Sequence, residues 1–305
     1  MTSPLVSICI PTYNGAEFLE EALNSAINQT YDNLEIIVSD DNSKDGTLKI
    51  IENYKSETNI PIQVYKHNPS GIGANWNNCI EKSNGDYIKF LFQDDLLAPS
   101  CIEKMVIQAE KSSKIGMVYS KRYIRYNSKN DKHKSWVENY SILHRNWNDL
   151  EILGNKIYKG RELLRNENLL SFPKNKIGEP TAVLLRKSIF KKVGFFSESL
   201  KQSLDVEFWC RLMKFYDAVF IDEKLVTFRL HDGQATNVNM ENNQLDENFL
   251  LSRSIYKHLF WQLDPKTQEA LFYKHNTVSI FIKRLINLFK RLKKRFNKGS
   301  NQSNT

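Results

Sequence analysis

An apolar, aromatic-rich run that ends on two adjacent carboxylates is the feature that most constrains the fold of this chain. Residues 88–93 have the composition of a buried strand, Asp94 and Asp95 follow at once, and a helical pattern opens at Pro99. The carboxyl ends of the strands in a parallel sheet are where such sheets bind ligands. Two neighbouring carboxylates repel each other unless one is solvated or both face a cation. The stretch therefore predicts a divalent-metal site at the edge of a sheet.

The chain before this run repeats one order of elements: strand, polar loop, helix. Strands are predicted at residues 5–10, 34–38 and 62–65, and helical spacing of apolar residues follows each of them after a polar loop. One unit takes roughly 25 to 30 residues, which is typical of βαβ units. We therefore expect an α/β fold, a doubly wound and mostly parallel sheet flanked by helices, with its loops gathered on one edge.

The pattern weakens in the second half of the chain. Residues 121–175 are polar and rich in Asn, Lys and Trp, with one short helical stretch near residues 160–165. Regular patterning returns at residues 178–185, in a helix from Lys187, in a segment over 203–213 and in a last strand over 225–230. The sequence shows no internal repeat and no low-complexity linker.

Charge is distributed unevenly along the 305 residues. The net charge is +8, but nine basic residues follow the last acidic one, Glu269, so that the residues up to it carry a net charge of −1. A hydrophobic fraction of 41% and a charged fraction of 26% describe an ordinary soluble globular protein. The body is therefore near neutral, and the basicity belongs to the C-terminal segment.

That segment predicts a basic amphipathic helix over residues 280–298. At about 100° per residue, apolar and basic side chains fall on opposite sides. The apolar side comprises Phe281, Ile282, Leu285, Ile286, Leu288, Phe289, Leu292 and Phe296. Such a helix is typical of anionic membrane surfaces, which predicts a protein peripheral on the cytoplasmic, inner face of a membrane. A helix docked on the domain, with a solvated basic face, is the alternative.

Other partners and compartments are constrained by absent patterns. Nucleic acid is not an expected partner, because the basicity is confined to one helix and no recognition motif accompanies it. The sequence shows no signal peptide and no apolar window of the about 18 residues that a spanning helix needs. Residues 299–305 are expected to be disordered. Four widely spaced cysteines are expected to be buried thiols in a reducing compartment: Cys9, Cys79, Cys101 and Cys210.

A second acidic pair, Asp40 and Asp41, follows the second predicted strand. In a doubly wound sheet this pair could face the same crevice as Asp94 and Asp95, and an acidic side chain there suits a ribose hydroxyl or a base imide. A plain polar turn is the alternative. The spacing over residues 41–52 also matches an EF-hand calcium loop, but an EF-hand begins with a helix, and a strand is predicted here.

Asp205 opens a helix whose inner face is expected to hold Phe208, Trp209, Leu212 and Phe215. The carboxylate could cap the N-terminus of that helix. It could instead act as a general base, taking a proton from an attacking hydroxyl in the crevice. Both interpretations stand on spacing alone.

Four segments together resemble the family 2 inverting glycosyltransferases of GT-A fold. They are VSICIPTYN at residues 6–14, IIVSDDNSKDGT at 36–47, GDYIKFLFQDD at 85–95, and the helix that carries Asp205. The resemblance implies a GT-A catalytic domain over residues 1–232, in which about 1–120 bind the nucleotide sugar and about 121–232 supply the acceptor side and the catalytic base. Residues 233–279 would then form a helical extension.

The resemblance also implies roles for individual residues on the donor side. Pro11 and Tyr13 would line the nucleotide pocket, and Asp41 would bind the uracil or an equivalent base. Asp94 would contact the ribose or the sugar. Asp95 would ligate the Mn²⁺ or Mg²⁺ that bridges the donor diphosphate.

On the acceptor side, Asp205 matches the position of the family's catalytic base. The family usually has an acidic pair there, whereas this chain has Leu204 before Asp205 and Glu207 two residues after it. Both Asp205 and Glu207 therefore remain candidates for the base. Arg229 and His231 fall where some members place diphosphate or metal contacts.

The implied activity is a metal-dependent, inverting transfer of a hexosyl or N-acetylhexosaminyl group from a nucleotide sugar, with a UDP-sugar as the first candidate. The acceptor would be a hydroxyl of a glycan or a lipid-linked glycan, as in surface polysaccharide synthesis. A nucleotidyltransferase is a second possibility, but it would need a Gly-rich or Arg-rich triphosphate loop near the first strand, and residues 11–15 do not provide one. A membrane-tethered module that binds nucleotide sugars without turnover is a third.

Overall fold

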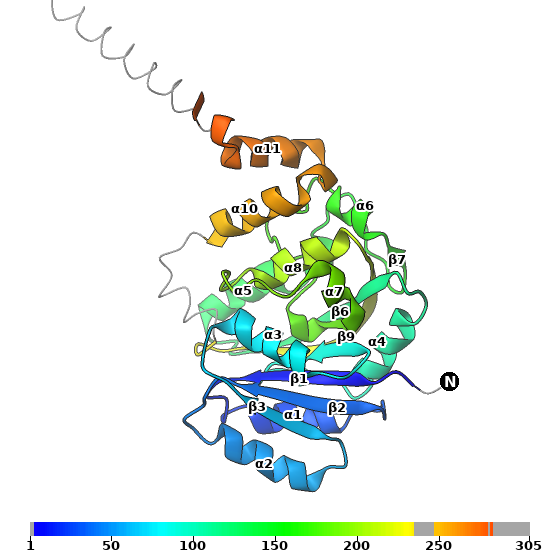
Figure 1. Ribbon diagram of the computed structural model, residues 1–305, viewed down its shortest axis with the longest axis vertical. Coiled ribbons are helices and arrows are strands. Elements are labelled where there is room, and N and C mark those ends of the chain that lie inside the picture. The colour runs from blue at the N-terminus through cyan, green and yellow to red at the C-terminus, as the bar shows by residue number, and fades with distance from the viewer. Residues whose placement is uncertain (1–2, 235–246, 280, 283–305) are drawn as a thin grey trace, which may run out of the picture.

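The computed structural model describes residues 3–234, 247–279 and 281–282. Within these residues the strands form a single mixed sheet in the order β3-β2-β1-β4-β8-β6-β9-β5, with β7 paired to β9 (Figure 1). The strands are β1 (Val6–Thr12), β2 (Leu34–Asp40), β3 (Ile62–Lys66), β4 (Tyr87–Phe90), β5 (Leu96–Leu97), β6 (Ile115–Tyr126), β7 (Ile157–Tyr158), β8 (Val183–Arg186) and β9 (Asp217–Leu230). The four N-terminal strands run parallel, and β8 pairs antiparallel with both β4 and β6. The predicted α/β fold of GT-A type is confirmed.

The sheet separates two hydrophobic cores, because alternate residues of each strand point to opposite faces. One core lies under α1 (Leu19–Ile27), α2 (Thr47–Glu57) and α4 (Cys101–Ala109). The other lies under α3 (Ile72–Lys82), α6 (Gly160–Leu164), α7 (Phe190–Val193) and α8 (Leu204–Met213). The four cysteines are buried as free thiols, as expected.

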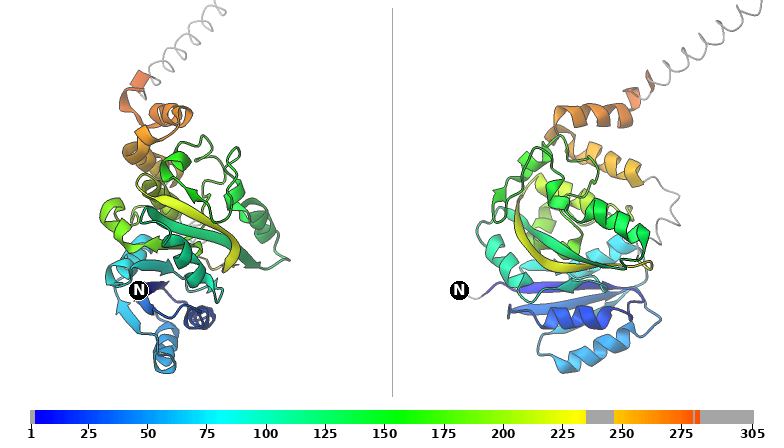
Figure 2. Two further views of the ribbon diagram at one scale, coloured as in Figure 1. Left: turned by 90° about the vertical axis from the view of Figure 1, so that its right-hand side faces the viewer. Right: turned by 180° about the vertical axis from the view of Figure 1, so that it is seen from behind.

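The predicted helical extension is present as α10 (Glu247–Leu259) and α11 (Pro265–His275), which lie beyond α8 and away from the sheet (Figure 2). The predicted basic helix over 280–298 lies outside the described residues except for Phe281 and Ile282. Among the described residues, no helix is both long and apolar enough to cross a membrane.

Several element boundaries differ from the prediction. The first strand continues through Pro11 instead of ending there. β4 pairs only with Val6–Cys9 of β1, so the N–H that proline lacks is not needed in that ladder. The helix after Pro99 begins at Cys101, once the short strand β5 has formed.

The polar region 121–175 holds more structure than predicted. The short helix near residues 160–165 is confirmed as α6, but α5 (Asp131–Tyr140) is a second helix that the prediction lacked. Phe215 lies beyond the end of α8 and is 38% exposed, so its assignment to the inner face was wrong. The helix ends at Met213, which is buried, and Phe215 follows it outside the helix.

The base of the parallel strands is held by a buried carboxylate. Glu35 is 5% exposed and accepts hydrogen bonds from the Ser7 hydroxyl at 2.6 Å and from the Asn84 N–H at 2.6 Å. The Ser7 oxygen in turn accepts the N–H of Gly85 at 2.8 Å, so that one side chain joins β1, β2 and the entry to β4. Burial alone would raise the pKa of Glu35, but these donors outweigh it and lower the pKa below its ordinary value.

We expect Glu35→Gln to lower the free energy of unfolding by about 2 kcal/mol at pH 7, the typical worth of a hydrogen bond to a charged group. Because the folded-state pKa is lowered, this stabilisation is present above the unfolded pKa and is lost as pH falls through the folded value. Urea unfolding from pH 7 to pH 3 should therefore show the variant and the wild type converging at the acid end. Glu81→Gln, on an exposed helix position, is the matched control. A difference that stays constant with pH would contradict the ionic contribution.

Candidate functional site

The carboxyl ends of β1 to β4 meet at one edge of the sheet, and most of the predicted donor-side residues lie there. Asp41 follows β2, and its Oδ1 lies 2.8 Å from Nε2 of His67, which follows β3. Burial raises the pKa of Asp41, His67 opposes this rise, and neighbouring Asp40 adds to it. Asp40 itself points inward, because its carboxylate accepts hydrogen bonds from the hydroxyls of Thr12 and Ser43. Asp41 is thus the member of the pair that is placed at the edge.

The loop after β1 is fixed to the end of β4 by Gln93. The Gln93 side chain accepts the Tyr13 N–H at 2.9 Å and donates to the Tyr13 carbonyl oxygen at 3.2 Å. A Cβ on Gly15 would come within 2.3 Å of the Gln93 side-chain oxygen, so any larger residue there would displace the Gln93 side chain from this position. The Tyr13 side chain is left 55% exposed beside Pro11, which is where a planar ligand could stack.

Asp94 is connected to both residues at the end of β9. Its Oδ2 lies 3.0 Å from Nε2 of His231, and its carbonyl oxygen accepts from Nε of Arg229 at 2.9 Å. The Arg229 guanidinium also pairs with Glu21 of α1 at 3.0 Å and lies over the ring of Phe18. These contacts bring Asp94, Arg229 and His231 together as one group.

Asp95 is almost completely buried, at 1% exposure. Its Oδ1 accepts the backbone N–H of Arg229 at 3.1 Å, whereas its Oδ2 is buried and accepts no hydrogen bond within the described structure. Burial raises the pKa of Asp95 well above its ordinary value, and the negative charges of Asp94 and Glu179 add to the rise. Hydrogen bonds from the Thr181 side chain and from the N–H of Arg229 oppose it. A buried carboxylate oxygen without a donor is costly unless a ligand satisfies it.

Asp205 lies in the first turn of α8 and is 9% exposed. The helix is preceded by Ser203 at the N-cap position, so Asp205 is not the capping residue. Its carboxylate accepts the Val206 N–H at 2.7 Å and the Asn175 side-chain amide at 2.8 Å. Burial, opposed by the Val206 N–H and reinforced by the charge of Glu179, raises the pKa of Asp205 to about 7. A carboxylate with such a pKa is suited to proton transfer near neutral pH.

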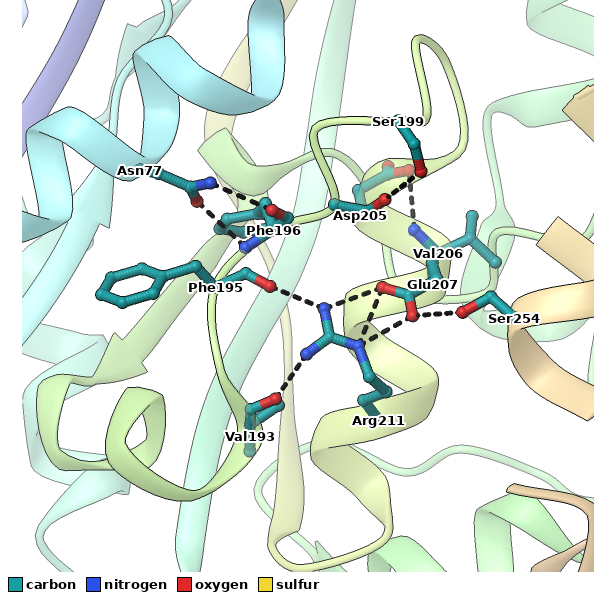
Figure 3. A network of polar contacts seen from close by, with 11 residues as sticks. Asn77, Val193, Phe195, Phe196, Ser199, Asp205, Val206, Glu207, Arg211 and Ser254 are labelled. Atoms are coloured by element: carbon teal, nitrogen blue, oxygen red, sulfur yellow. Dashed lines mark hydrogen bonds and ion pairs between the residues drawn. The ribbon is translucent and has the colours of Figure 1, made fainter. Parts of the chain in front are cut away.

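Glu207 lies in quite different surroundings (Figure 3). Both of its oxygens accept from the Arg211 guanidinium at 2.8–2.9 Å, and Oε1 also accepts from the hydroxyl of Ser254 in α10. Arg211 in turn donates to the carbonyl oxygen of Phe195 at 2.7 Å and to that of Val193. The Glu207 carboxylate therefore ties α8 to α10 and to the loop after α7.

Several further residues of the site carried no sequence motif. Glu179 forms an ion pair of 2.9 Å with Arg122, and its charge acts on both Asp95 and Asp205. Lys89 is fully buried in β4 and donates to the carbonyl oxygens of Thr181 and Val183. Position at the end of a strand could have marked His67, which follows β3 as Asp41 follows β2. No local signal marks Glu179, because it is brought to the site from an irregular segment.

The donor set suits a hard divalent cation that is shared with a substrate. The buried, unpaired oxygen of Asp95 is the kind of ligand that Mg²⁺ and Mn²⁺ take. Within the described residues no group of three or more His, Cys, Asp or Glu side chains could hold a metal by itself. This fits an ion that is bound by one or two carboxylates and completed by substrate phosphates and water.

Comparison with known sequences identifies the family of this chain. The family model for glycosyl transferase family 2 matches residues 7–194. An uncharacterised glycosyltransferase of Rickettsia typhi is 31% identical over 290 residues, which cover 92% of this chain and 81% of that protein. An uncharacterised protein of Mycobacterium tuberculosis is 30% identical over 223 residues, or 73% of this chain and 66% of that protein.

Two solved structures share the fold. TarS of S. aureus, residues 1–349 in complex with UDP-GlcNAc, superposes with a TM-score of 0.58 at 16% identity, covering 91% of this chain and 75% of that chain. The mannosyltransferase PcManGT of Pyrobaculum calidifontis, in complex with GDP-Man and Mn²⁺, has a TM-score of 0.55 at 14% identity, covering 91% and 71%. The motifs at the sheet edge, the fold and the family match agree, and the chain belongs to glycosyl transferase family 2, as a nucleotide-sugar-dependent glycosyltransferase of GT-A fold.

Proposed function

We propose that this enzyme transfers a sugar, with inversion, from a nucleotide diphosphate donor to an acceptor hydroxyl, and that the transfer depends on a divalent metal. The observation that carries the proposal is the buried Oδ2 of Asp95, which accepts no hydrogen bond from any residue that the structure describes. UDP-sugars are the first candidates and GDP-mannose the next, since TarS was solved with UDP-GlcNAc and PcManGT with GDP-Man and Mn²⁺. A hexosyl or N-acetylhexosaminyl group would then be transferred.

The donor nucleotide would lie over the ends of β1 to β3. Asp41 would accept a hydrogen bond from the base, and its contact with His67 holds the carboxylate at the sheet edge. Pro11 and the exposed ring of Tyr13 would line the pocket. Asp94 would contact the ribose or the sugar, with His231 and Arg229 beside it.

Asp95 would hold the metal. A divalent cation there would neutralise the charge that develops on the leaving nucleoside diphosphate. The N–H of Arg229 fixes one carboxylate oxygen, so that the other is presented without reorganisation.

Asp205 is our candidate for the base, and Glu207 a structural residue. Asp205 would take the proton of the acceptor hydroxyl as that oxygen attacks the anomeric carbon from the face opposite the diphosphate, which inverts the configuration in one displacement. Glu207 is saturated by Arg211 and Ser254, so it has no oxygen left for an acceptor proton.

The acceptor would bind on the side formed by residues 121–232. Trp136 of α5 stacks on Phe228 of β9 and on Tyr140, with ring centroids 5.2 Å and 5.0 Å apart. Phe172 lies edge-on to Tyr140 and is 67% exposed, three residues from the Asn175 that holds Asp205. Aromatic faces of this kind suit the C–H face of a sugar ring. The acceptor we propose is a glycan or lipid-linked glycan at the cytoplasmic face of a membrane, which the enzyme would approach through the basic helix that the sequence predicts over residues 280–298.

Metal-dependent donor binding is the first test. We expect UDP or a UDP-sugar with Mn²⁺ to stabilise the full-length protein by about 3 kcal/mol at about 100 times Kd, and much less without metal. Asp95→Asn should abolish the metal-dependent shift in thermal unfolding, while the matched control Asp32→Asn, exposed at the opposite edge of the sheet, should retain it. No metal-dependent shift with any uridine or guanosine nucleotide would contradict the donor site.

Asp205 predicts the pH dependence of turnover. Because the base must be ionised to accept a proton and its pKa is about 7, kcat/KM should rise with pH through that value and then level off. Asp205→Asn should lower kcat by about 10² to 10⁴ while donor binding persists. Unchanged turnover in Asp205→Asn would favour another base, and retained binding without any turnover in the wild type would favour the binding-module alternative.

Glu207 provides the contrasting variant. Glu207→Ala leaves the Arg211 guanidinium without its carboxylate, and removing one partner of a buried pair typically costs about 3 to 5 kcal/mol. We therefore expect a marked fall in urea resistance. The milder Ser254→Ala should cost about 1 kcal/mol. Per folded molecule, both variants should keep the wild-type pH profile, and loss of the rise in kcat/KM with pH in Glu207→Gln would reassign the base.

A further inference from the structure

Glu179 is an acidic residue with one oxygen held and the other left without a partner. Its Oε2 pairs with Arg122 at 2.9 Å, and its Oε1 is buried and accepts no hydrogen bond within the described residues. The side chain as a whole is 15% exposed, so it borders the open part of the site. An unpaired buried carboxylate oxygen is a cost to the fold that a ligand donor would remove.

The direction of this carboxylate is fixed by Arg122. The Arg122 side chain is 5% exposed, donates to the carbonyl oxygen of Tyr140 at 2.6 Å, and lies under the rings of Trp136 and Phe228. An arginine held on three sides cannot follow a moving partner. It therefore acts as a positioning residue that holds Oε2 of Glu179, while Oε1 keeps its capacity to accept a hydrogen bond.

The backbone around Glu179 is held with equal firmness. The carbonyl oxygen of Gly178 accepts from the indole of Trp209 in α8 at 3.0 Å, and the Thr181 carbonyl oxygen accepts from buried Lys89 of β4. Asn175 reaches Asp205 through its side-chain amide. The segment 175–181 thus spans the distance between the end of β4 and the start of α8, and Glu179 is near its middle.

The charge of Glu179 acts on the carboxyl groups at both ends of this segment. It adds to the electrostatic environment of Asp95 on the sheet side and of Asp205 on the helix side. The other charges that face this space are those of Lys89, Arg122 and Asp94. Glu179 is therefore close enough to both proposed catalytic carboxylates to interact with each.

In a single displacement the transferred sugar must lie between the diphosphate and the base. This inference rests on the proposed function, in which Asp95 lies at the diphosphate end of the donor sugar and Asp205 at the end where the base acts. We propose that Oε1 of Glu179 accepts a hydrogen bond from a hydroxyl, or an amide N–H, of the donor sugar. Glu179 would then determine which donor sugar binds, whereas the residues at the ends of β1 to β3 would bind the nucleotide.

The test compares each nucleotide sugar with its own nucleoside diphosphate. Affinities of UDP, UDP-glucose, UDP-galactose and UDP-GlcNAc, and of GDP with GDP-mannose, are measured with Mn²⁺ by calorimetry on the full-length protein. For the preferred donor, Glu179→Gln and Glu179→Asp should weaken binding of the nucleotide sugar about 10- to 100-fold, the range for a lost hydrogen bond to a charged group. Binding of the nucleoside diphosphate should change by less than about twofold, and Glu81→Gln should change neither.

Deoxy analogues of the preferred donor give a test on the wild type that does not depend on the folding of a variant. Removal of one hydroxyl, or of the N-acetyl N–H, should weaken binding to the wild type by the factor seen in the variant, and should have no further effect in Glu179→Gln. Equal losses for nucleotide and nucleotide sugar in the variant, or no position on the sugar with such coupling, would overturn the assignment. Failure of the wild type to bind any of the nucleoside diphosphates with metal would instead remove the proposed function itself.

Discussion

The site depends on one carboxylate that is buried with half of its hydrogen-bonding capacity unused. Asp95 lies beyond the end of β4, where the chain no longer pairs in the sheet but is still buried. Among the described residues, the N–H of Arg229 donates to one of its carboxylate oxygens and the other accepts no hydrogen bond. Such a group costs free energy in the ligand-free protein, and the cost disappears when a cation or a donor reaches the oxygen. This unused hydrogen-bonding capacity of Asp95 is thus the source of the site's affinity for a ligand.

The surroundings keep this cost within limits without neutralising the site. Lys89 lies fully buried behind the acidic group, Arg122 holds Glu179, and Arg229 is held by Glu21. Each of these three cations is held by carbonyl oxygens or by another carboxylate, so none of them moves to pair with Asp95. The acids therefore remain available as acceptors, and their arrangement is set before any substrate binds.

The sequence predicted what local periodicity can carry. The sequence locates the strands that precede Asp41 and Asp95 because apolar runs stop on acidic residues, and the helix of Asp205 because its apolar spacing is regular. Glu179, Arg122 and Lys89 could not be predicted, because they are brought together by pairings between residues about 60 to 90 positions apart in the chain, which leave no local pattern. The helix α5 was missed because its buried side is small, with His133 as its one buried residue among those described, and so it lacks an apolar stripe.

Asp205 and Glu207 show why a short acidic motif has no single meaning. Two positions apart on an α-helix is about 200° around its axis, so the two carboxylates lie on nearly opposite sides of α8. One faces Asn175 and the charge of Glu179, where none of the described cationic side chains forms an ion pair with it, and its pKa rises. The other faces Arg211 and α10, where four hydrogen bonds hold its carboxylate in place. The side of the helix that each residue occupies, set by the packing of α8 between the sheet and α10, separates the group suited to proton transfer from the group suited to holding the fold.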